Sequence, residues 1–103
     1  MKKIYVAGAY SADNVISVLN NIAAGQKKSA EILKGGDAPF CPWLDFMFQL
    51  HDQTLTVDDY YAYSMAWLEV SDEVYVLKGW ENSKGTIAEI KRAEELGIPV
   101  TYE

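Results

Sequence analysis

A glutamate on the apolar side of a predicted helix is the first residue of this sequence that points to chemistry. The stretch GWENSKGTIAEI, residues 79–90, opens with polar residues and glycines and continues as a helix. At about 100° per residue, Glu89 falls between Ala93 and Leu96, on the side that faces the protein. The helix dipole favours the ionised form of Glu89, whereas burial raises its pKa. An ionised but partly desolvated carboxylate suits attack on an anomeric carbon, where positive charge develops. The alternative is a glutamate that only caps its own helix.

The beginning of the same helix offers hydroxyls and free backbone amides. Ser83, Gly85 and Thr86 lie there, and a helix start of this kind can bind an anion. Simple capping of the helix is the alternative. The sequence contains neither GxGxxG nor GxxxxGK[ST], so it lacks the dinucleotide fingerprint and the P-loop.

Four further residues have types and positions that are compatible with a binding site. Ser64 lies within the apolar stripe of a helix predicted over residues 57–70, where a serine bonded to its own backbone is the alternative. Asp72 directly precedes a predicted strand, as a turn or cap aspartate also would. Tyr10 and Trp80 lie near predicted strand ends, where an aromatic ring either stacks on a ligand or packs in the core.

The elements that must position these residues alternate along the chain. Strands are predicted over 2–8, 38–42, 73–78 and 98–102; helices are predicted from Ser11 or Asp13 to Lys34, from Thr56 to Val70, and from the loop 79–86 to Gly97. Residues 43–55 fit either a helical turn or an ordered loop. Alternating strands and helices predict an α/β fold with a parallel sheet. We expect a flavodoxin-like or Rossmann-like three-layer sandwich, a single domain over 1–103, with strand order 2-1-3-4.

Two unusual loops converge in this topology. Ligands of such sheets bind outside the carboxyl ends of the strands, near the point where the strand order reverses. The loop GAYS, which contains Gly8 and Ser11, and the loop GWENSKG, residues 79–85, both lie there. The sequence therefore predicts a cleft between them, with Glu89 inside it.

The composition of the chain indicates which kinds of partner it can bind. The chain has 103 residues and a formal net charge of -6, which argues against a surface for a nucleic-acid polymer but not against one small nucleotide. Cys41 is the only cysteine, so an intrachain disulfide is impossible, and no zinc-type ligand spacing occurs. We expect no cofactor and no metal. The N-terminus has no convincing signal peptide or membrane span, so we expect a cytoplasmic protein without a membrane partner.

The motifs together resemble a known family. The segments IYVAGAYSA and WLEVSDEVYVLKGWENSKGTIAEIKRAEELGIPV are similar to the nucleoside 2-deoxyribosyltransferase superfamily, most of all to its short bacterial and phage branch of unassigned function. The superfamily also contains the 2'-deoxynucleoside 5'-monophosphate N-glycosidases. The resemblance covers a little under half of the chain.

The resemblance implies a role for several residues. Glu89 matches the catalytic nucleophile, and Tyr10 matches an aromatic that orients this glutamate or the sugar. Ser83 and Gly85 match the loop that holds the 5' end of the substrate, and Asp72 matches a chiefly structural aspartate near the site. The predicted substrate-binding set is completed by Gly8, Ser11, Ser64, Thr86 and Trp80.

One position departs from the family pattern. The family has an aspartate eight positions before the residue that Asp72 matches, and this aspartate assists protonation of the departing base. Ser64 stands there, and a serine is a poor proton donor at neutral pH. Asp58 or Asp59, earlier on the same helix, is a possible substitute.

Three functions follow from these observations. The chain is an N-glycosidase or deoxyribosyltransferase acting on a nucleoside or nucleotide, a non-catalytic nucleotide-binding module, or a small interaction protein whose aromatics serve an oligomer interface. We also expect a homo-oligomer, because a domain with four strands leaves apolar surface uncovered.

Overall fold

Four parallel strands form the centre of the molecule. The computed structural model describes residues 1–103, except for the side chain of Leu44. The strands are β1 (Lys3–Ala7), β2 (Ala38–Phe40), β3 (Glu73–Val76) and β4 (Val100–Tyr102), paired in the order β2-β1-β3-β4. This confirms the predicted α/β fold and strand order, with β1 and β3 at the centre of the sheet.

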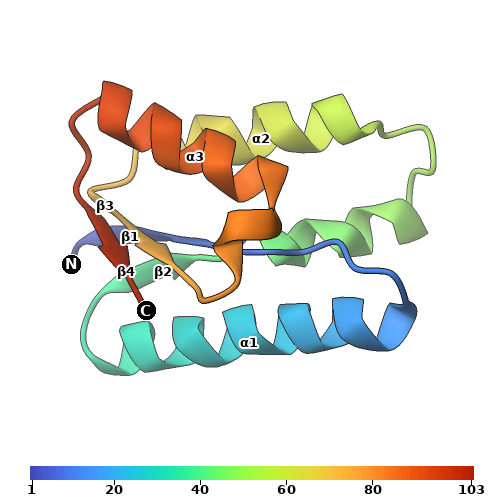
Figure 1. The fold of residues 1–103 in the computed structure, drawn as a ribbon, viewed down its shortest axis with the longest axis horizontal. Helices are drawn as coiled ribbons and strands as arrows, with labels where there is room; N and C mark the ends of the chain where they lie inside the picture. The colour runs from blue at the N-terminus through green and yellow to red at the C-terminus, as the bar shows by residue number, and fades with distance from the viewer.

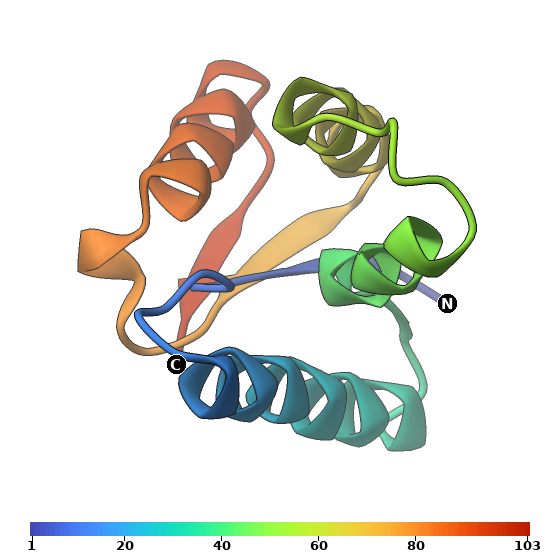
Figure 2. The same ribbon diagram turned by 90° about the vertical axis from the view of Figure 1, so that its right-hand side faces the viewer.

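Helices cover both faces of the sheet and make three layers (Figure 1). Helix α1 (Val15–Lys34) lies on one face, and α2 (Val57–Glu69) and α3 (Lys84–Glu95) lie side by side on the other, as Figure 2 shows from a second direction. Two short 3-10 helices, η1 (Pro42–Leu50) and η2 (Trp80–Asn82), follow the ends of β2 and β3. The loop after β1, η1 and η2 therefore all lie at the carboxyl edge of the sheet.

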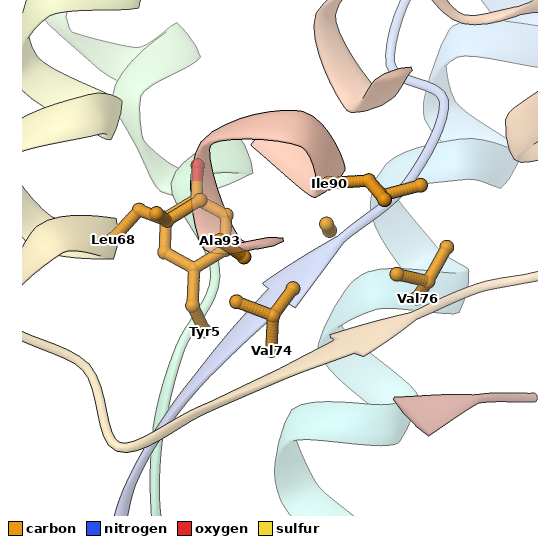
Figure 3. Close-up of a cluster of buried hydrophobic side chains, with 7 residues drawn as sticks. Tyr5, Leu68, Val74, Val76, Ile90 and Ala93 are labelled. Atoms are coloured by element: carbon orange, nitrogen blue, oxygen red, sulfur yellow. The ribbon is translucent and has the colours of Figure 1, made fainter. Parts of the chain in front are cut away.

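Alternation along β1 divides the core into two. Tyr5 and Ala7 point toward α2 and α3, where they join Leu68, Val74, Val76, Ile90 and Ala93 (Figure 3). Val6 points to the other face and packs with Ile22, Cys41, Trp43 and Leu77. Successive strand residues face opposite sides of a sheet, so the two cores meet only through the strands.

The helix starts follow from local capping. The side chain of Asn14 accepts a hydrogen bond from the Ser17 amide, so α1 begins at Val15 and the predicted caps Ser11 and Asp13 are wrong. Thr56 and Asp59 form the reciprocal capping box expected at the start of α2.

The ambiguous segment 43–55 is largely a 3-10 helix. β2 ends at Phe40 rather than at residue 42, because Pro42 begins η1. Trp43 is buried against α1, where a Cβ on Gly25 would lie only 2.2 Å from the indole ring. Gly25 of α1 therefore lets the indole ring approach the helix backbone.

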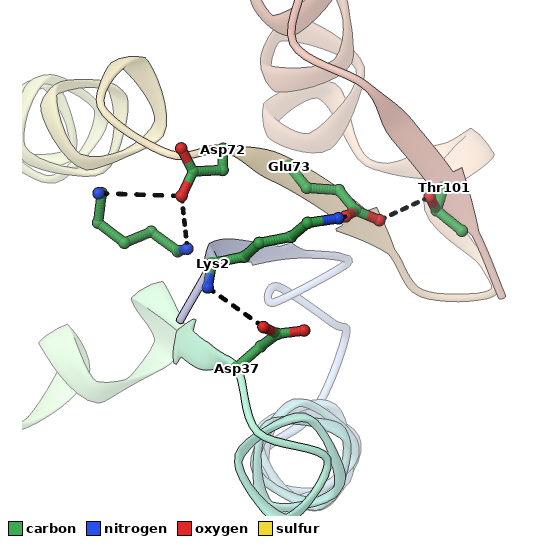
Figure 4. A network of polar contacts seen from close by, with 6 residues as sticks. Lys2, Asp37, Asp72, Glu73 and Thr101 are labelled. Carbon is green, nitrogen blue, oxygen red and sulfur yellow. Dashed lines mark hydrogen bonds and ion pairs between the residues drawn. The ribbon is translucent and has the colours of Figure 1, made fainter.

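Polar contacts join the amino ends of the strands (Figure 4). The Lys2 amide donates to Asp37, and the Lys3 amide donates to Asp72 at 2.8 Å. Glu73 accepts a hydrogen bond from Thr101 at 2.9 Å. These contacts align strand starts on the edge opposite to the loops predicted to form the site.

Candidate functional site

Glu89 lies in the second turn of α3 and is bound to a tyrosine of the central strand. The Tyr5 hydroxyl donates a hydrogen bond to Glu89 Oε2. Tyr5 is fully buried, and its ring rises from β1 with the hydroxyl pointing away from the sheet (Figure 3). Ser83 caps α3, which fixes the rotation of the helix that directs Glu89 inward. The carboxylate on the apolar side is thus held by a donor from the sheet.

Burial controls the charge of this pair. Desolvation raises the pKa of Glu89 to about 7; the hydrogen bond from Tyr5 acts in the opposite direction, and the charge of Asp45 adds a smaller increase. Burial, followed by the neighbouring Glu89 charge, raises the pKa of Tyr5 far above its ordinary value, so its hydroxyl stays a donor. The increase that burial was expected to cause is therefore the largest effect on the pKa of Glu89.

Ser64 joins the pair from α2. Its side chain is half-buried, and its hydrogen bonding to the Tyr5 side chain acts to lower the pKa of the Tyr5 hydroxyl. Three polar groups from β1, α2 and α3 are therefore brought together above the sheet. Of the predicted site residues, Ser64 and Glu89 belong to this cluster.

Asp45 brings a second carboxylate toward the cluster from η1. Its charge raises the pKa of Glu89, and it acts in the same direction on Tyr5, Tyr10 and Tyr63. Asp45 is itself half-buried, and desolvation raises its pKa to about 6. The site thus has two carboxyl groups whose pKa values are both raised by burial.

Tyr10 has different surroundings from those expected. The hydroxyl that binds Glu89 is that of Tyr5, five residues earlier, so the orienting role expected of Tyr10 stays a prediction. Tyr10 is 38% exposed, its carbonyl accepts a hydrogen bond from Asn21 of α1, and its pKa is raised by burial, then by Asp45 and Tyr60. It lies on the η1 side of the site, where a role in contacting a ligand stays a prediction.

The residues at the start of α3 are engaged in capping. The Ser83 hydroxyl lies 2.9 Å from that of Thr86 and accepts from the Thr86 amide. Thr86 is buried, and a Cβ on Gly85 would lie 3.7 Å from the Tyr61 ring of α2. The capping alternative holds for Ser83, and the free amides at this helix start stay the predicted anion site.

In the loop after β1, Gly8 is closely packed and Ser11 is exposed. A Cβ on Gly8 would lie 3.1 Å from both Leu77 and Trp43, so the bare backbone fits closely there. Ser11 is exposed in the loop that follows. Their predicted contacts with a substrate stay predictions.

Two predicted residues have their contacts at other parts of the sheet. Trp80 packs on Tyr102 with ring centroids 5.5 Å apart, on the β4 side, and lines a cavity of about 120 Å³ with residues of 76–81. Asp72 accepts a hydrogen bond from the Lys3 amide at the amino edge of the sheet, opposite to the loops of the site, and its chiefly structural role stays a prediction. A second cavity, of about 190 Å³, lies beside α1; Glu89 lines neither.

Sequence reasoning missed Tyr5 and Asp45, although both left a signal. A tyrosine within a buried strand needs a partner for its hydroxyl, and Glu89 was the one acid already placed on the buried side. Asp45 interrupts the apolar run WLDFMF, which is the same anomaly that singled out Glu89. It was overlooked because the structure of 43–55 was ambiguous.

Membrane-spanning helices and metal-binding clusters are absent from the residues that the structure describes. None of their helices is long and apolar enough to cross a membrane. Among them, no group of three or more His, Cys, Asp or Glu side chains is arranged to hold a metal ion.

Comparison with known proteins identifies the family. A family model described as a domain of unknown function (DUF4406) matches residues 2–102. The chain belongs to the DUF4406 family. No curated protein is similar to it in sequence at a significant level.

A solved structure has the same fold as this DUF4406 chain. It is a 2-deoxyribosyltransferase from Bacillus psychrosaccharolyticus, described as a biocatalyst for nucleoside synthesis. The two chains superpose with a TM-score of 0.72 and 17% identity, over 97% of this chain and 70% of the other. The expected likeness to the deoxyribosyltransferases is thus confirmed at the level of the fold.

Proposed function

We propose that this chain cleaves the N-glycosidic bond of a nucleoside or nucleoside 5'-monophosphate, or transfers its deoxyribosyl group, with Glu89 as the nucleophile. The hydrogen bond between Tyr5 and Glu89 carries the proposal. It holds a desolvated carboxylate at the second turn of a helix that starts at the ligand-binding edge of the sheet. The shared fold with a deoxyribosyltransferase supports the same chemistry.

The pair accounts for the first chemical step. Tyr5 donates to Oε2, which leaves Oε1 of Glu89 to attack C1' of the sugar. The C1'–O bond forms as the C1'–N bond breaks, and the electron pair of that bond leaves with the base. Water or a second base then attacks C1' and releases Glu89. Because the pKa of Glu89 is about 7, the ionised nucleophile becomes more abundant as the pH rises through neutrality.

The other predicted residues surround this reaction in the proposal. The backbone amides at the start of α3 that are not engaged by the Ser83 cap, beside Ser83, Gly85 and Thr86, bind the 5' hydroxyl or phosphate of the substrate. Tyr10, 38% exposed, contacts the sugar or base from the η1 side. The partner is accordingly a small molecule, and we expect neither a nucleic-acid polymer nor a membrane.

A panel assay tests the proposal. Deoxynucleosides and their 5'-monophosphates are incubated with the protein, with and without a second free base, and products are separated by chromatography. Release of base alone indicates hydrolysis, whereas a new nucleoside indicates transfer. Glu89→Gln should abolish both, and the matched control Glu94→Gln, exposed on the same helix, should retain activity. A parent without activity on any substrate contradicts the proposal.

A non-catalytic nucleotide-binding module is the second candidate. Ser64 favours it, because the resemblance places this residue at the position of the family's proton donor and a serine is a poor acid at neutral pH. A nucleotide would then raise the melting temperature of the protein without release of base.

We further propose a homo-oligomer. α1 exposes apolar side chains near its start, with Val15 72%, Ile16 66% and Leu19 48% exposed. Exposed apolar side chains gathered on one helix are typical of an interaction surface. The alternative of a small interaction protein would use this surface without any chemistry at Glu89.

A further inference from the structure

The proton donor for the departing base is the missing part of the proposed reaction. A purine or pyrimidine leaves poorly as an anion, so a nearby acid must protonate it. Ser64 cannot supply this proton at neutral pH. Asp59 accepts from the amide and hydroxyl of Thr56 in the capping box, and Asp58 is exposed on the first turn of α2. The acid must therefore come from another element.

Asp45 of η1 is a half-buried carboxyl group whose charge acts on the groups of the site. Its charge acts on Tyr5 of β1, Tyr10 of the following loop, Tyr63 of α2 and Glu89 of α3, and on Cys41 just before its own helix. Those five titratable groups come from the elements around the site. They include Glu89, its partner Tyr5, and Tyr10, which the proposal places against the sugar or base.

The Asp45 carboxyl is also uncommitted. Among the described residues, no side chain forms a hydrogen bond or ion pair with it, whereas Asp37, Asp52, Asp59 and Asp72 each bind an amide. Burial is the sole cause of its raised pKa. No buried side-chain oxygen of the described residues lacks a partner, so the Asp45 oxygens contact solvent and are accessible to a ligand atom.

We infer that Asp45 is the general acid that protonates the base as the N-glycosidic bond breaks, a catalytic role moved from α2 to η1. This inference rests on the proposed function and names the residue that completes it. The Asp45 proton moves to a ring nitrogen of the base, which takes the electron pair of the C1'–N bond, while Glu89 forms its bond to C1'. In the second step the Asp45 carboxylate takes a proton from water, whose oxygen attacks C1' and displaces Glu89.

The two carboxyl groups share protons near neutral pH. The reaction needs one proton on the pair, held by Asp45, and one negative charge, held by Glu89. Burial raises the pKa of Asp45 to about 6 and that of Glu89 to about 7, so near neutrality a single proton on the pair resides mostly on Glu89, and the reactive arrangement is the less populated of the two one-proton forms. The activity should therefore pass through a maximum near neutral pH and fall on both sides.

Two substrates with different leaving groups test the inference. A deoxynucleoside needs protonation of its base, whereas 4-nitrophenyl 2-deoxyriboside releases a phenolate that is stable without a proton. Asp45→Asn should lower kcat on the deoxynucleoside by about 10²–10⁴-fold and change kcat on the nitrophenyl substrate by less than about tenfold. Glu89→Gln should abolish both reactions, and Asp45→Glu should restore part of the first.

Several outcomes would overturn the assignment. An equal loss on both substrates in Asp45→Asn would show that Asp45 is not the acid, while leaving the proposed function intact. A selective loss in the control Asp58→Asn would give the role to Asp58. No activity of the parent on either substrate would overturn the proposed function together with this inference. Loss of the alkaline limb of the pH profile in Asp45→Asn supports it independently, since an asparagine carries no proton to lose.

Discussion

Removal of the Tyr5 hydroxyl gives the sharpest test of the site as described. In Tyr5→Phe the ring still fills its fully buried position, but Glu89 Oε2 loses its donor. A hydrogen bond to a charged group contributes about 1.5–3 kcal/mol and one between neutral groups about 0.5–1.5 kcal/mol. The cost of the substitution should therefore depend on the protonation of Glu89.

The pKa of Glu89 determines at which pH the substitution Tyr5→Phe costs more stability. Its pKa in the folded protein is about 7, and the hydrogen bond from Tyr5 acts to lower it. The carboxyl group is neutral at pH 5 and largely ionised at pH 8.5. We expect Tyr5→Phe to lower the free energy of unfolding by about 1 kcal/mol at pH 5 and by about 2–3 kcal/mol at pH 8.5. The difference corresponds to a rise of about one unit in the pKa of Glu89.

Urea denaturation at the two pH values measures this difference. Tyr75→Phe is the matched control, because Tyr75 belongs to the other core and its ring lies under Lys28, which stays charged at both pH values. Its effect on the free energy of unfolding should be the same at pH 5 and pH 8.5. An equal effect of Tyr5→Phe at the two pH values would refute the reasoning, and so would a larger effect at pH 5.

Three further predictions concern stability and assembly. The pKa of Glu89 is raised from 4.5 in the ordinary state to about 7 in the fold, so its contribution to stability is fully present below about pH 4.5 and is lost as the pH rises through 7. Glu89→Gln should flatten this decline, as followed by melting temperature from pH 4 to 8. Thr56→Ala removes the capping box of α2 and should lower the free energy of unfolding by about 1 kcal/mol, whereas Thr54→Ala, outside the helix, should cost less in the same urea titration. Light scattering under dilute conditions should give at least twice the monomer mass, and Val15→Glu with Ile16→Glu should return the monomer.

The alternation of elements made the fold predictable. Strong β-forming runs such as KIYVA and EVYV, with glycines and capping residues between helical stripes, leave little choice beyond a parallel sheet. Errors occurred at ends, where one hydrogen bond decides. Asn14 rather than Ser11 or Asp13 accepts from an amide, and nothing in the composition of this loop distinguishes the three.

The candidate site was predictable in part. The position of Glu89 follows from helical periodicity alone, since any helix here turns it inward. Its partner depends on tertiary packing, because Tyr5 is 84 residues away along the chain. The position of Asp45 was harder to predict, because it lies on a 3-10 helix that hydrophobic periodicity does not reveal. A site residue was therefore predictable where a single helix fixes its orientation, and not where its role depends on contacts between two or more elements.

The contact between Gly25 and Trp43 links the far face of the sheet to the site. Glycine in the middle of an exposed helix costs about 1 kcal/mol relative to alanine, so Gly25→Ala would ordinarily be a stabilising change. Here the added methyl group would meet the indole ring at 2.2 Å, and Trp43 would have to move. Asp45 lies two residues further along η1, so that movement would pass to the carboxyl group beside Glu89. A substitution on α1, in the opposite layer from Glu89, could thus alter rate or substrate preference without touching any residue of the site, which makes this helix a place from which to tune the protein.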